Sequence, residues 1–351
     1  MSEAMAQESV LLTGATGNVG AITLEHLIRA NHKVNIVIRK TSAIAFFESK
    51  FADAVKSGLL TFTVIPDMTI AGAFDEPSSS ATAIVHLATP LAGPGSDLVK
   101  EMIEPTWTID ENILEAAKKS KTVKRVVICG SIVQTVLLPD FFNPNVVISE
   151  KNFNPITFEE AKNDPLSAYV FAKTDAEHKT WSWVDTNRPD FDVVMLLPPL
   201  IAGRSPQPGY KPIANGPGGN SAVYTALLAG DDVQGVDNIL PFVLNTDDVA
   251  KSHVTALDRN KVPGNERYLL VSPEIMDLRA IAVDLRAESP ELAKRIPALQ
   301  PNLERRGREK FAKIDTSKSD AVFGTQWKSG HNTIKEVVLD VLQWEKENNV
   351  N

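Results

Sequence analysis

The stretch Val10-Leu11-Leu12-Thr13-Gly14-Ala15-Thr16-Gly17-Asn18-Val19-Gly20 decides the fold of this 351-residue chain. A short apolar run leads into three glycines with the spacing G-x-x-G-x-x-G, and an apolar-periodic segment follows over 21–28. This order predicts a strand, a tight turn and a helix. Glycines let the backbone turn sharply and let a pyrophosphate come close, and the N-terminus of a helix offers unpaired N–H groups to phosphates. We therefore predict a dinucleotide site formed by Thr13, Gly14, Thr16, Gly17, Asn18, Val19 and Gly20.

Strand-like and helix-like segments alternate after this first unit. Further strands are expected over 33–38, 60–65, 83–88, 123–129, 192–197 and 267–271, and helices over 43–55, 97–120 (capped by Ser96 or Asp97), 166–186 and 331–348. Such alternation indicates βαβ units and a parallel sheet covered on both faces. Right-handed crossovers then give an α/β fold with a doubly wound parallel sheet of the Rossmann type.

The later part of the chain predicts a second, smaller unit. We expect a dinucleotide-binding domain over 9–198 plus about 236–260, and a discontinuous C-terminal substrate lobe over about 199–235 plus 261–348. Residues 1–8 are expected to be a flexible N-terminus. The segment 204–219 holds four prolines and four glycines, which predicts a lid that becomes ordered on binding. The charged segment 288–313 is expected to be a solvated surface.

Composition excludes several classes of protein. The net charge of -8 argues against a nucleic-acid partner, because phosphate binding requires a basic face. Cys129 is the single cysteine, which excludes an intrachain disulfide and fits a reducing compartment. Residues 1–8 lack the pattern of a secretory signal, and no apolar run is long enough to span a membrane. No metal-binding spacing occurs, so we expect no metal site. We also expect the protein to be cytoplasmic and to be a monomer or a homodimer.

Tyr169-Val170-Phe171-Ala172-Lys173 is the second informative motif. On a helix, the i and i+4 side chains lie on one face, one turn apart. An ammonium group beside a phenol favours the phenolate, so Lys173 is expected to lower the pKa of Tyr169 towards neutral pH. This would make Tyr169 a general acid–base. The alternative is an incidental pair on the surface.

Ser131 follows the strand expected over 123–129. Ligands bind at the carboxyl ends of strands in doubly wound sheets, so its hydroxyl is placed to hydrogen-bond a substrate carbonyl. The alternative is a serine that only caps the next helix.

Together, the glycine turn, Ser131 and Tyr169-x-x-x-Lys173 resemble the extended short-chain dehydrogenases/reductases. More closely, the chain resembles the branch that holds plant dihydroflavonol reductases and fungal NADPH-dependent aldehyde and ketone reductases. The resemblance covers about residues 9–345 and includes the segments His86-Leu87-Ala88-Thr89-Pro90, Lys173-Thr174-Asp175-Ala176-Glu177, Leu197-Pro198-Pro199-Leu200, Asn245-Thr246-Asp247-Asp248-Val249-Ala250 and Asp315-Thr316-Ser317-Lys318. Two departures stand out: Gly130-Ser131 replaces the usual S-S, and Ile109-Asp110 replaces a common G-T.

The resemblance implies a role for each catalytic residue. Tyr169 would protonate a carbonyl oxygen while NADPH delivers hydride to the carbon, Lys173 would hold the nicotinamide ribose and keep the phenol acidic, and Ser131 would orient the carbonyl. Asn112 matches the helix asparagine of the family, which can support a proton relay through water. The alternative is a helix residue that bonds the backbone.

The end of the strand expected over 33–38 indicates the cofactor. Ile38-Arg39-Lys40 carries no acid to accept from a ribose 2′-OH, and an Arg accommodates a 2′-phosphate, so NADPH is favoured over NADH. Asp67 matches a family position that reaches towards the adenine, or it is a turn residue. The remaining expected cofactor contacts are Met68, Leu87, Ala88, Thr89, Lys173, Pro198 and Leu200. The expected substrate contacts are Pro90, Ser131, Val133, Tyr169, Pro199, Tyr210 and Tyr224.

These observations predict an NADPH-dependent carbonyl reductase for a small to medium, largely apolar ketone or aldehyde. One alternative is an NAD-dependent epimerase/dehydratase or a hydroxysteroid-type dehydrogenase on the same scaffold. Another is a non-catalytic regulator that binds a nicotinamide cofactor and senses redox state.

Overall fold

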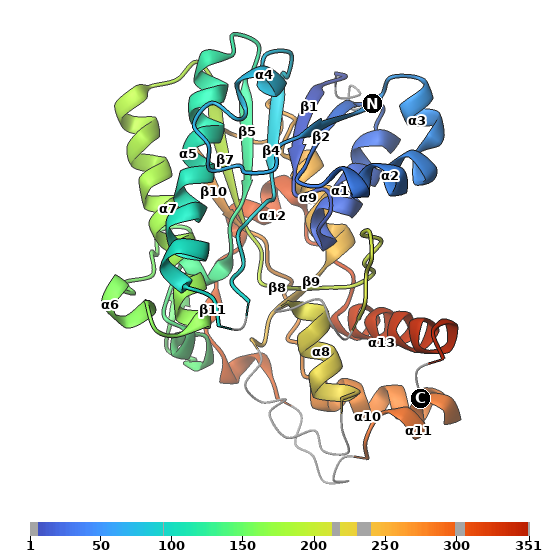
Figure 1. Cartoon of the computed structure of the whole chain (residues 1–351). Helices are drawn as coiled ribbons and strands as arrows, with labels where there is room; N and C mark the ends of the chain where they lie inside the picture. The colour runs from blue at the N-terminus through green and yellow to red at the C-terminus, as the bar shows by residue number, and fades with distance from the viewer. Residues whose placement is uncertain (1–5, 94, 213–217, 230–239, 299–305, 350–351) are drawn as a thin grey trace.

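A seven-stranded parallel sheet forms the centre of the molecule (Figure 1). The computed structural model describes residues 6–93, 95–212, 218–229, 240–298 and 306–349. The strand order is β10-β7-β5-β4-β1-β2-β3, and each neighbouring pair is parallel. The strands are β1 (Ser9–Thr13), β2 (Lys33–Ile38), β3 (Leu60–Val64), β4 (Ala83–His86), β5 (Arg125–Cys129), β7 (Asp192–Leu197) and β10 (Glu266–Leu269). The order reverses between β1 and β4, which is where doubly wound sheets bind ligands, so the predicted fold class is confirmed.

Alternate residues of each strand enter different cores on the two faces of the sheet. Leu11 and Ile84 pack towards α5 (Glu104–Lys119) and α7 (Pro165–Asn187). Leu12 and Val85 pack towards α1 (Asn18–Arg29) and α9 (Thr246–Thr255). Figure 1 shows α5 and α7 on one side of the sheet, and α1, α2 (Ile44–Lys50) and α9 on the other. Both faces are therefore covered, which explains why the central strands β1, β4, β5 and β7 are mostly apolar.

A smaller core lies beyond the carboxyl ends of the strands. It is built around the two-stranded sheet of β8 (Leu200–Ala202) and β9 (Val243–Asn245), with α8 (Gly219–Leu227), α10 (Leu278–Glu288), α11 (Pro290–Arg295) and α13 (Gly330–Glu347). These helices gather in the lower part of Figure 1. Val223, Ile281, Leu292 and Val337 are buried together in this core. The chain thus carries a lobe of the kind expected over the strand ends.

Two boundary expectations need correction. The lobe segment expected over 261–348 includes β10, which is an edge strand of the central sheet. Helix α12 (Ser317–Phe323) packs on β10, with 5.5 Å between the ring centroids of Tyr268 and Phe323. These two segments therefore belong with the central sheet and not with the lobe. The segment 288–313 is not simply a solvated surface either, because Leu292, Ile296 and Phe311 are buried within it. Residues 236 and 299–305 lie outside the described part of the chain.

Two expected helices differ in detail. The helix expected over 43–55 is a short 3-10 turn (Thr41–Ala43) followed by α2 (Ile44–Lys50) and α3 (Ala52–Lys56), which are separated at Phe51. The helix expected over 97–120 begins with a π-helical turn, Val99–Ile103, before α5. Its start is capped as expected by Asp97, whose Oδ1 accepts from the N–H groups of Val99 and Lys100.

The remaining short elements are α4 (Asp75–Ser78), β6 (Val147–Ile148), α6 (Phe158–Ala161), β11 (Lys313–Ile314) and the 3-10 turns Ile132–Gln134, Leu138–Phe142 and Arg308–Lys310. Among the described residues, no helix is long and apolar enough to cross a membrane. Residues 1–5 and 213–217 lie outside the described part, so neither the flexible N-terminus nor the lid over 204–219 is tested.

Candidate active site

The glycine turn between β1 and α1 leaves an open helix N-terminus. Gly14 has φ +75°, and a Cβ there would lie 2.8 Å from the Ala88 nitrogen, while a Cβ on Gly20 would lie 2.0 Å from the Gly14 oxygen. No side chain caps α1 and no acid occupies its first turn, so its first N–H groups are available to an anion. Asn18 Oδ1 is buried without a partner in the described residues. This turn fits the pyrophosphate of a dinucleotide.

Thr13 is buried beneath that turn and braces β4. Its Oγ1 lies 2.7 Å from His86 Nδ1 and accepts from the N–H groups of Leu87 and Ala88 at 3.2 Å. His86 Nε2 in turn lies 3.0 Å from a carboxylate oxygen of Asp110 on α5. Asp110, one of the residues at which this chain departs from the family pattern, thus forms a buried pair with His86. Thr13 lies beneath the glycine turn and contacts the residues that follow β4.

Arg39 and Lys40 follow the end of β2 and are exposed. Neither side chain has a polar partner among the residues that the structure describes. Two cations at this position fit a 2′-phosphate, and the cofactor contacts of Arg39 and Lys40 stay a prediction.

Asp67 and Asn112 organise the segment that follows β3. Oδ1 of Asp67 accepts from the backbone N–H of Thr69 over 2.9 Å and from its hydroxyl over 2.6 Å, which lowers the pKa of this carboxyl. Asn112 donates from Nδ2 to the carbonyl oxygens of Met68 and Ile70, over 3.0 and 3.2 Å. Asp67 is therefore a turn residue in this structure. Both contacts of Asn112 Nδ2 are on the loop, which favours its alternative role as a residue that bonds the backbone.

Tyr169 and Lys173 lie one turn apart on α7, close to the end of β5. Lys173 Nζ donates to the carbonyl oxygen of Cys129 over 2.8 Å and to Thr89 Oγ1 over 3.4 Å. Burial raises the pKa of Tyr169, and it outweighs the opposing effects of the Lys173 charge and of a hydrogen bond with Ser131. The expected lowering of this pKa is thus wrong in its net direction, because desolvation of the phenol dominates. A phenol that stays protonated is suited to donate a proton.

Ser131 caps the turn that follows it, and its role towards a substrate carbonyl stays a prediction. It caps the 3-10 turn Ile132–Gln134, with its Oγ accepting from the Val133 N–H over 3.5 Å, and, against the larger effect of burial, its hydroxyl acts to lower the pKa of the nearby Tyr169. At the neighbouring Gly130, a Cβ would lie 2.5 Å from Leu197 Cδ2 and 2.7 Å from Gln134 Oε1, so both of these side chains would have to shift to admit a larger residue. The glycine that replaces the first serine of the usual S-S pair thus lies against the side chains of Leu197 and Gln134.

Cys129 precedes this pair and is an unsuitable nucleophile. Burial raises the pKa of its thiol to about 11, although the nearby Lys173 charge acts in the opposite direction. The thiol therefore stays protonated at neutral pH.

The other expected contacts are distributed around this edge of the sheet. Leu87, Ala88, Thr89 and Pro90 are half-buried after β4, Val133, Pro198 and Pro199 are buried, and Leu200 is half-buried at the start of β8. Two expected substrate residues, Tyr210 and Tyr224, contact residues of the lobe, and their role towards a substrate stays a prediction. Tyr210 accepts a hydrogen bond at its phenolic oxygen from Asn220 Nδ2 over 3.1 Å, and Tyr224 packs against the lobe core near Arg295. In the described chain, no contact joins either tyrosine to Ser131 or Tyr169.

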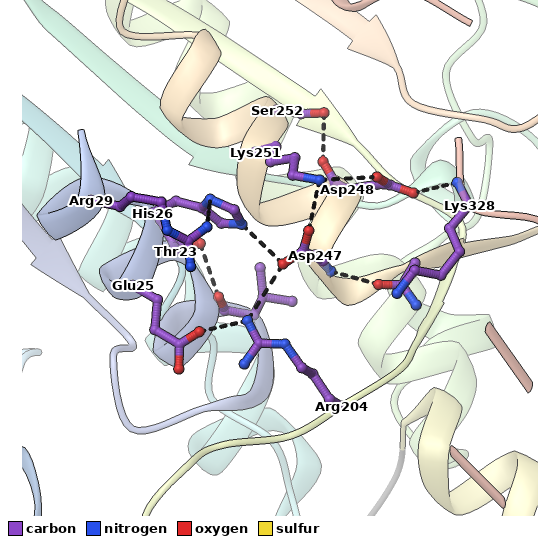
Figure 2. A network of polar contacts seen from close by, with 12 residues as sticks. Thr23, Glu25, His26, Arg29, Arg204, Asp247, Asp248, Lys251, Ser252 and Lys328 are labelled. Atoms are coloured by element: carbon purple, nitrogen blue, oxygen red, sulfur yellow. Dashed lines mark hydrogen bonds and ion pairs between the residues drawn. The ribbon is translucent and has the colours of Figure 1, made fainter. Parts of the chain in front are cut away.

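A polar network fixes the cofactor-binding helix to the rest of the molecule (Figure 2). Arg204, from the loop after β8, bonds Glu25 of α1 over 2.5 Å and Asp247 of α9 over 3.4 Å. Asp247 also contacts His26 over 3.0 Å and Lys251 over 2.8 Å. The residues come from three distant segments, so no local sequence pattern indicated the network.

The fold and site define a dinucleotide-binding α/β protein with serine, tyrosine and lysine at the carboxyl edge of its sheet. Residues 10–270 match the NAD dependent epimerase/dehydratase family, and the chain belongs to this family.

Curated relatives and a solved structure extend the comparison. The chain is 25% identical over 343 residues to a putative NADPH-dependent methylglyoxal reductase, GRP2, of Candida albicans, covering 95% of this chain and 98% of the relative. It is 34% identical over 269 residues to the NAD-dependent epimerase/dehydratase ALT6 of Alternaria alternata, covering 72% and 73%. The structure of yeast methylglyoxal/isovaleraldehyde reductase Gre2 complexed with NADPH superposes with a TM-score of 0.84 at 21% identity, covering 96% of this chain and 99% of that one.

Proposed function

We propose that this protein is an NADPH-dependent carbonyl reductase that converts a ketone or aldehyde to an alcohol. The observation that carries the proposal is the placement of Lys173. Its ammonium group is bound to the end of β5 and lies one helical turn from Tyr169, whose pKa is raised overall by burial, against the lowering effect of the nearby Ser131 hydroxyl. The three groups are thus gathered at the sheet edge where the glycine turn offers its helix N-terminus.

The residues divide the work between proton transfer and orientation. Tyr169, protonated at neutral pH, donates its phenolic proton to the carbonyl oxygen as that oxygen gains negative charge. The hydroxyl of Ser131 donates a hydrogen bond to the same oxygen and orients it. Lys173 stabilises the phenolate that remains, until solvent returns a proton. NADPH, when bound, supplies the hydride.

The chain's own residues fit NADPH. The uncapped N-terminus of α1, whose first N–H groups lack side-chain partners, would hold the pyrophosphate. Arg39 and Lys40 would pair with the 2′-phosphate. Thr89 and Lys173 would meet the nicotinamide ribose, since Lys173 already contacts Thr89.

Small carbonyl compounds are the proposed substrates. One relative is named for methylglyoxal, and the structural neighbour for methylglyoxal and isovaleraldehyde. We extend this class to small and medium, largely apolar ketones and aldehydes. We also propose a cytoplasmic location, which the single cysteine favours, and a monomer or homodimer. Light scattering on the purified protein would decide the oligomeric state.

An NAD-dependent epimerase or dehydratase is the second candidate, because the family and one relative carry that name. Ser131-Ile132-Val133 lacks the acids that eliminate water in sugar dehydratases of this scaffold, and Arg39 disfavours NAD. Tightly bound NAD⁺ in freshly purified protein would favour this candidate over the reductase.

The first experiment is oxidation of NADPH, and separately of NADH, with methylglyoxal, isovaleraldehyde, aryl ketones, β-keto esters and dihydroflavonols. We expect turnover with NADPH well above NADH. The Tyr169→Phe variant should bind NADPH normally and lose turnover by about 100-fold or more. NADPH binding without turnover of any compound would instead support a non-catalytic redox regulator.

A further inference from the structure

A buried chain of polar side chains leads from Ser131 into the protein interior. Gln134 Oε1 accepts from the backbone N–H of Ser131, and Gln134 Nε2 donates to Glu177 Oε2 over 2.7 Å. The same carboxylate oxygen accepts from the guanidinium group of Arg267 over 2.7 Å. Gln134 and Glu177 are each 1% exposed, and Arg267 is 6% exposed. We call these three side chains the relay: Gln134 lies in the turn after β5, Glu177 on helix α7 and Arg267 on strand β10.

The charge of Glu177 determines how the Gln134 amide is oriented. An ionised carboxylate only accepts hydrogen bonds, so the NH₂ end of the amide must face it. The carbonyl end then faces the Ser131 N–H. Reversal of the amide would place two oxygens together and leave the Ser131 N–H without a partner, which is costly in a buried site.

Arg267 makes the buried carboxylate tolerable. It pairs with the charge of Glu177, while Trp181 Nε1 donates to the other carboxylate oxygen over 3.1 Å. Arg267 itself donates to the carbonyl oxygens of Glu150 and Asn152 and stacks on the ring of Phe153, with 3.9 Å from its Cζ to the ring centroid. Gln134, Glu177 and Arg267 therefore act as one unit, because removal of any one of them leaves a buried polar group without its partner.

We propose that Gln134, Glu177 and Arg267 are positioning residues that fix the backbone of Ser131 and so hold its hydroxyl against Tyr169 and the substrate carbonyl. This inference rests on the proposed reductase function. It also explains why Glu177 occurs in the Lys173-Thr174-Asp175-Ala176-Glu177 segment, one turn after the catalytic lysine. Small displacements of a catalytic group are known to cost large factors in rate, which gives the relay a measurable effect.

The Gln134→Met variant removes the relay at its contact with Ser131 while keeping side-chain length. We expect kcat for carbonyl reduction to fall by about tenfold or more, with the Kd for NADPH within about twofold of the wild type. Hydrogen exchange of the Ser131 amide should become at least about tenfold faster, since its N–H loses its acceptor.

Asp192→Asn provides a matched control for lost stability. Asp192 pairs with buried Arg125 through contacts of 2.6 and 3.0 Å at the amino ends of β5 and β7, away from Ser131. This variant should lower the unfolding temperature without changing kcat or the exchange of the Ser131 amide. Equal kcat and equal Ser131 exchange in Gln134→Met and the wild type would overturn the relay. A wild type without turnover would refute the reductase function, and the exchange measurement would still decide the relay.

Gln134→Glu separates positioning from packing. When protonated, its carboxylic acid can donate to Glu177 and accept from Ser131, as the amide does; when ionised, it faces a second carboxylate and is repelled. We expect near-normal kcat at low pH and a decline as pH rises, whereas Gln134→Met stays impaired at every pH. Parallel pH profiles of the two variants would contradict the proposed orientation mechanism.

Discussion

The ammonium group of Lys173 donates a hydrogen bond over 2.8 Å to the backbone carbonyl oxygen of Cys129, the last residue of β5. This contact ties the middle of α7 to the edge of the central sheet. No carboxylate among the described residues pairs with Lys173, so its charge is not neutralised locally and acts on the phenol of Tyr169 one helical turn away. The backbone contact therefore places a cation beside the proton donor without cancelling its charge.

Replacement of Lys173 by Met should leave the phenolate of Tyr169 without its stabilising cation. We expect kcat for carbonyl reduction to fall by about 100-fold or more, the scale of a lost contribution to general acid catalysis. Steady-state kinetics at saturating NADPH measure the effect, with Lys179→Met on the same helix as the control, because the exposed Lys179 pairs with Asp175 and lies over the ring of Trp107. If the Lys173→Met variant keeps more than a tenth of the activity, then the Lys173 charge is not needed to stabilise the Tyr169 phenolate.

The raised pKa of Tyr169 determines the pH dependence. Burial holds this pKa above the ordinary value of about 10, and reduction requires the protonated phenol. The kcat/KM for reduction should therefore be flat from about pH 6 to 9 and fall only above about pH 10. Oxidation of the alcohol needs the phenolate, so the kcat/KM for oxidation should rise as the kcat/KM for reduction falls, above about pH 10. A descending limb near pH 7 in the reduction profile would assign proton donation to another group.

Arg39 should control the choice between NADPH and NADH. Its replacement by Ala removes a charge-assisted contact of about 1.5–3 kcal/mol to a 2′-phosphate, so the KM for NADPH should rise roughly ten- to 100-fold. The KM for NADH should stay within about twofold. Lys33→Ala, an exposed cation at the opposite end of the same strand, should change neither. Equal losses with both cofactors would place Arg39 outside the 2′-phosphate site.

The fold was predictable because its signals are local. The glycine turn, the apolar strands and the intervening helices each follow from a few consecutive residues, and their alternation determines the sheet. The Tyr169-x-x-x-Lys173 pair was readable for the same reason, since helical spacing alone places both side chains on one face. The edge strand β10 was expected as a strand but assigned to the lobe, because pairing between distant segments is not visible in a single sequence.

The rest of the site depends on burial and on distant contacts. The sign of the Tyr169 pKa shift could not be derived from the Lys173 spacing, because desolvation depends on what packs over the phenol. Gln134 carried a local signal, since Ser131-x-x-Gln134 is a capping-box pattern. Nothing near it in sequence indicated Glu177 or Arg267. Nothing near Asp110 in sequence indicated its partner either, because Asp110 lies on α5 and His86 lies on β4.

Asp247 should make a pH-dependent contribution to stability. Burial opposes its ionisation, but hydrogen bonds from Lys251 and His26 outweigh burial and hold its pKa well below the ordinary value (Figure 2). A carboxyl whose pKa is depressed in the folded state adds stability above its unfolded pKa of about 3.9 and loses it below. Asp247→Asn should therefore cost about 2 kcal/mol at pH 7, the scale of a hydrogen bond to a charged group.

Urea unfolding between pH 7 and pH 3 tests this prediction. The difference between the wild type and Asp247→Asn should be constant down to about pH 4.5 and then shrink by up to about 1.4 kcal/mol for each further pH unit. Asp53→Asn, on an exposed position of α3, should show no difference at any pH. If the stability loss of Asp247→Asn is the same at pH 3 as at pH 7, then packing of the side chain rather than its charge joins α1 to α9.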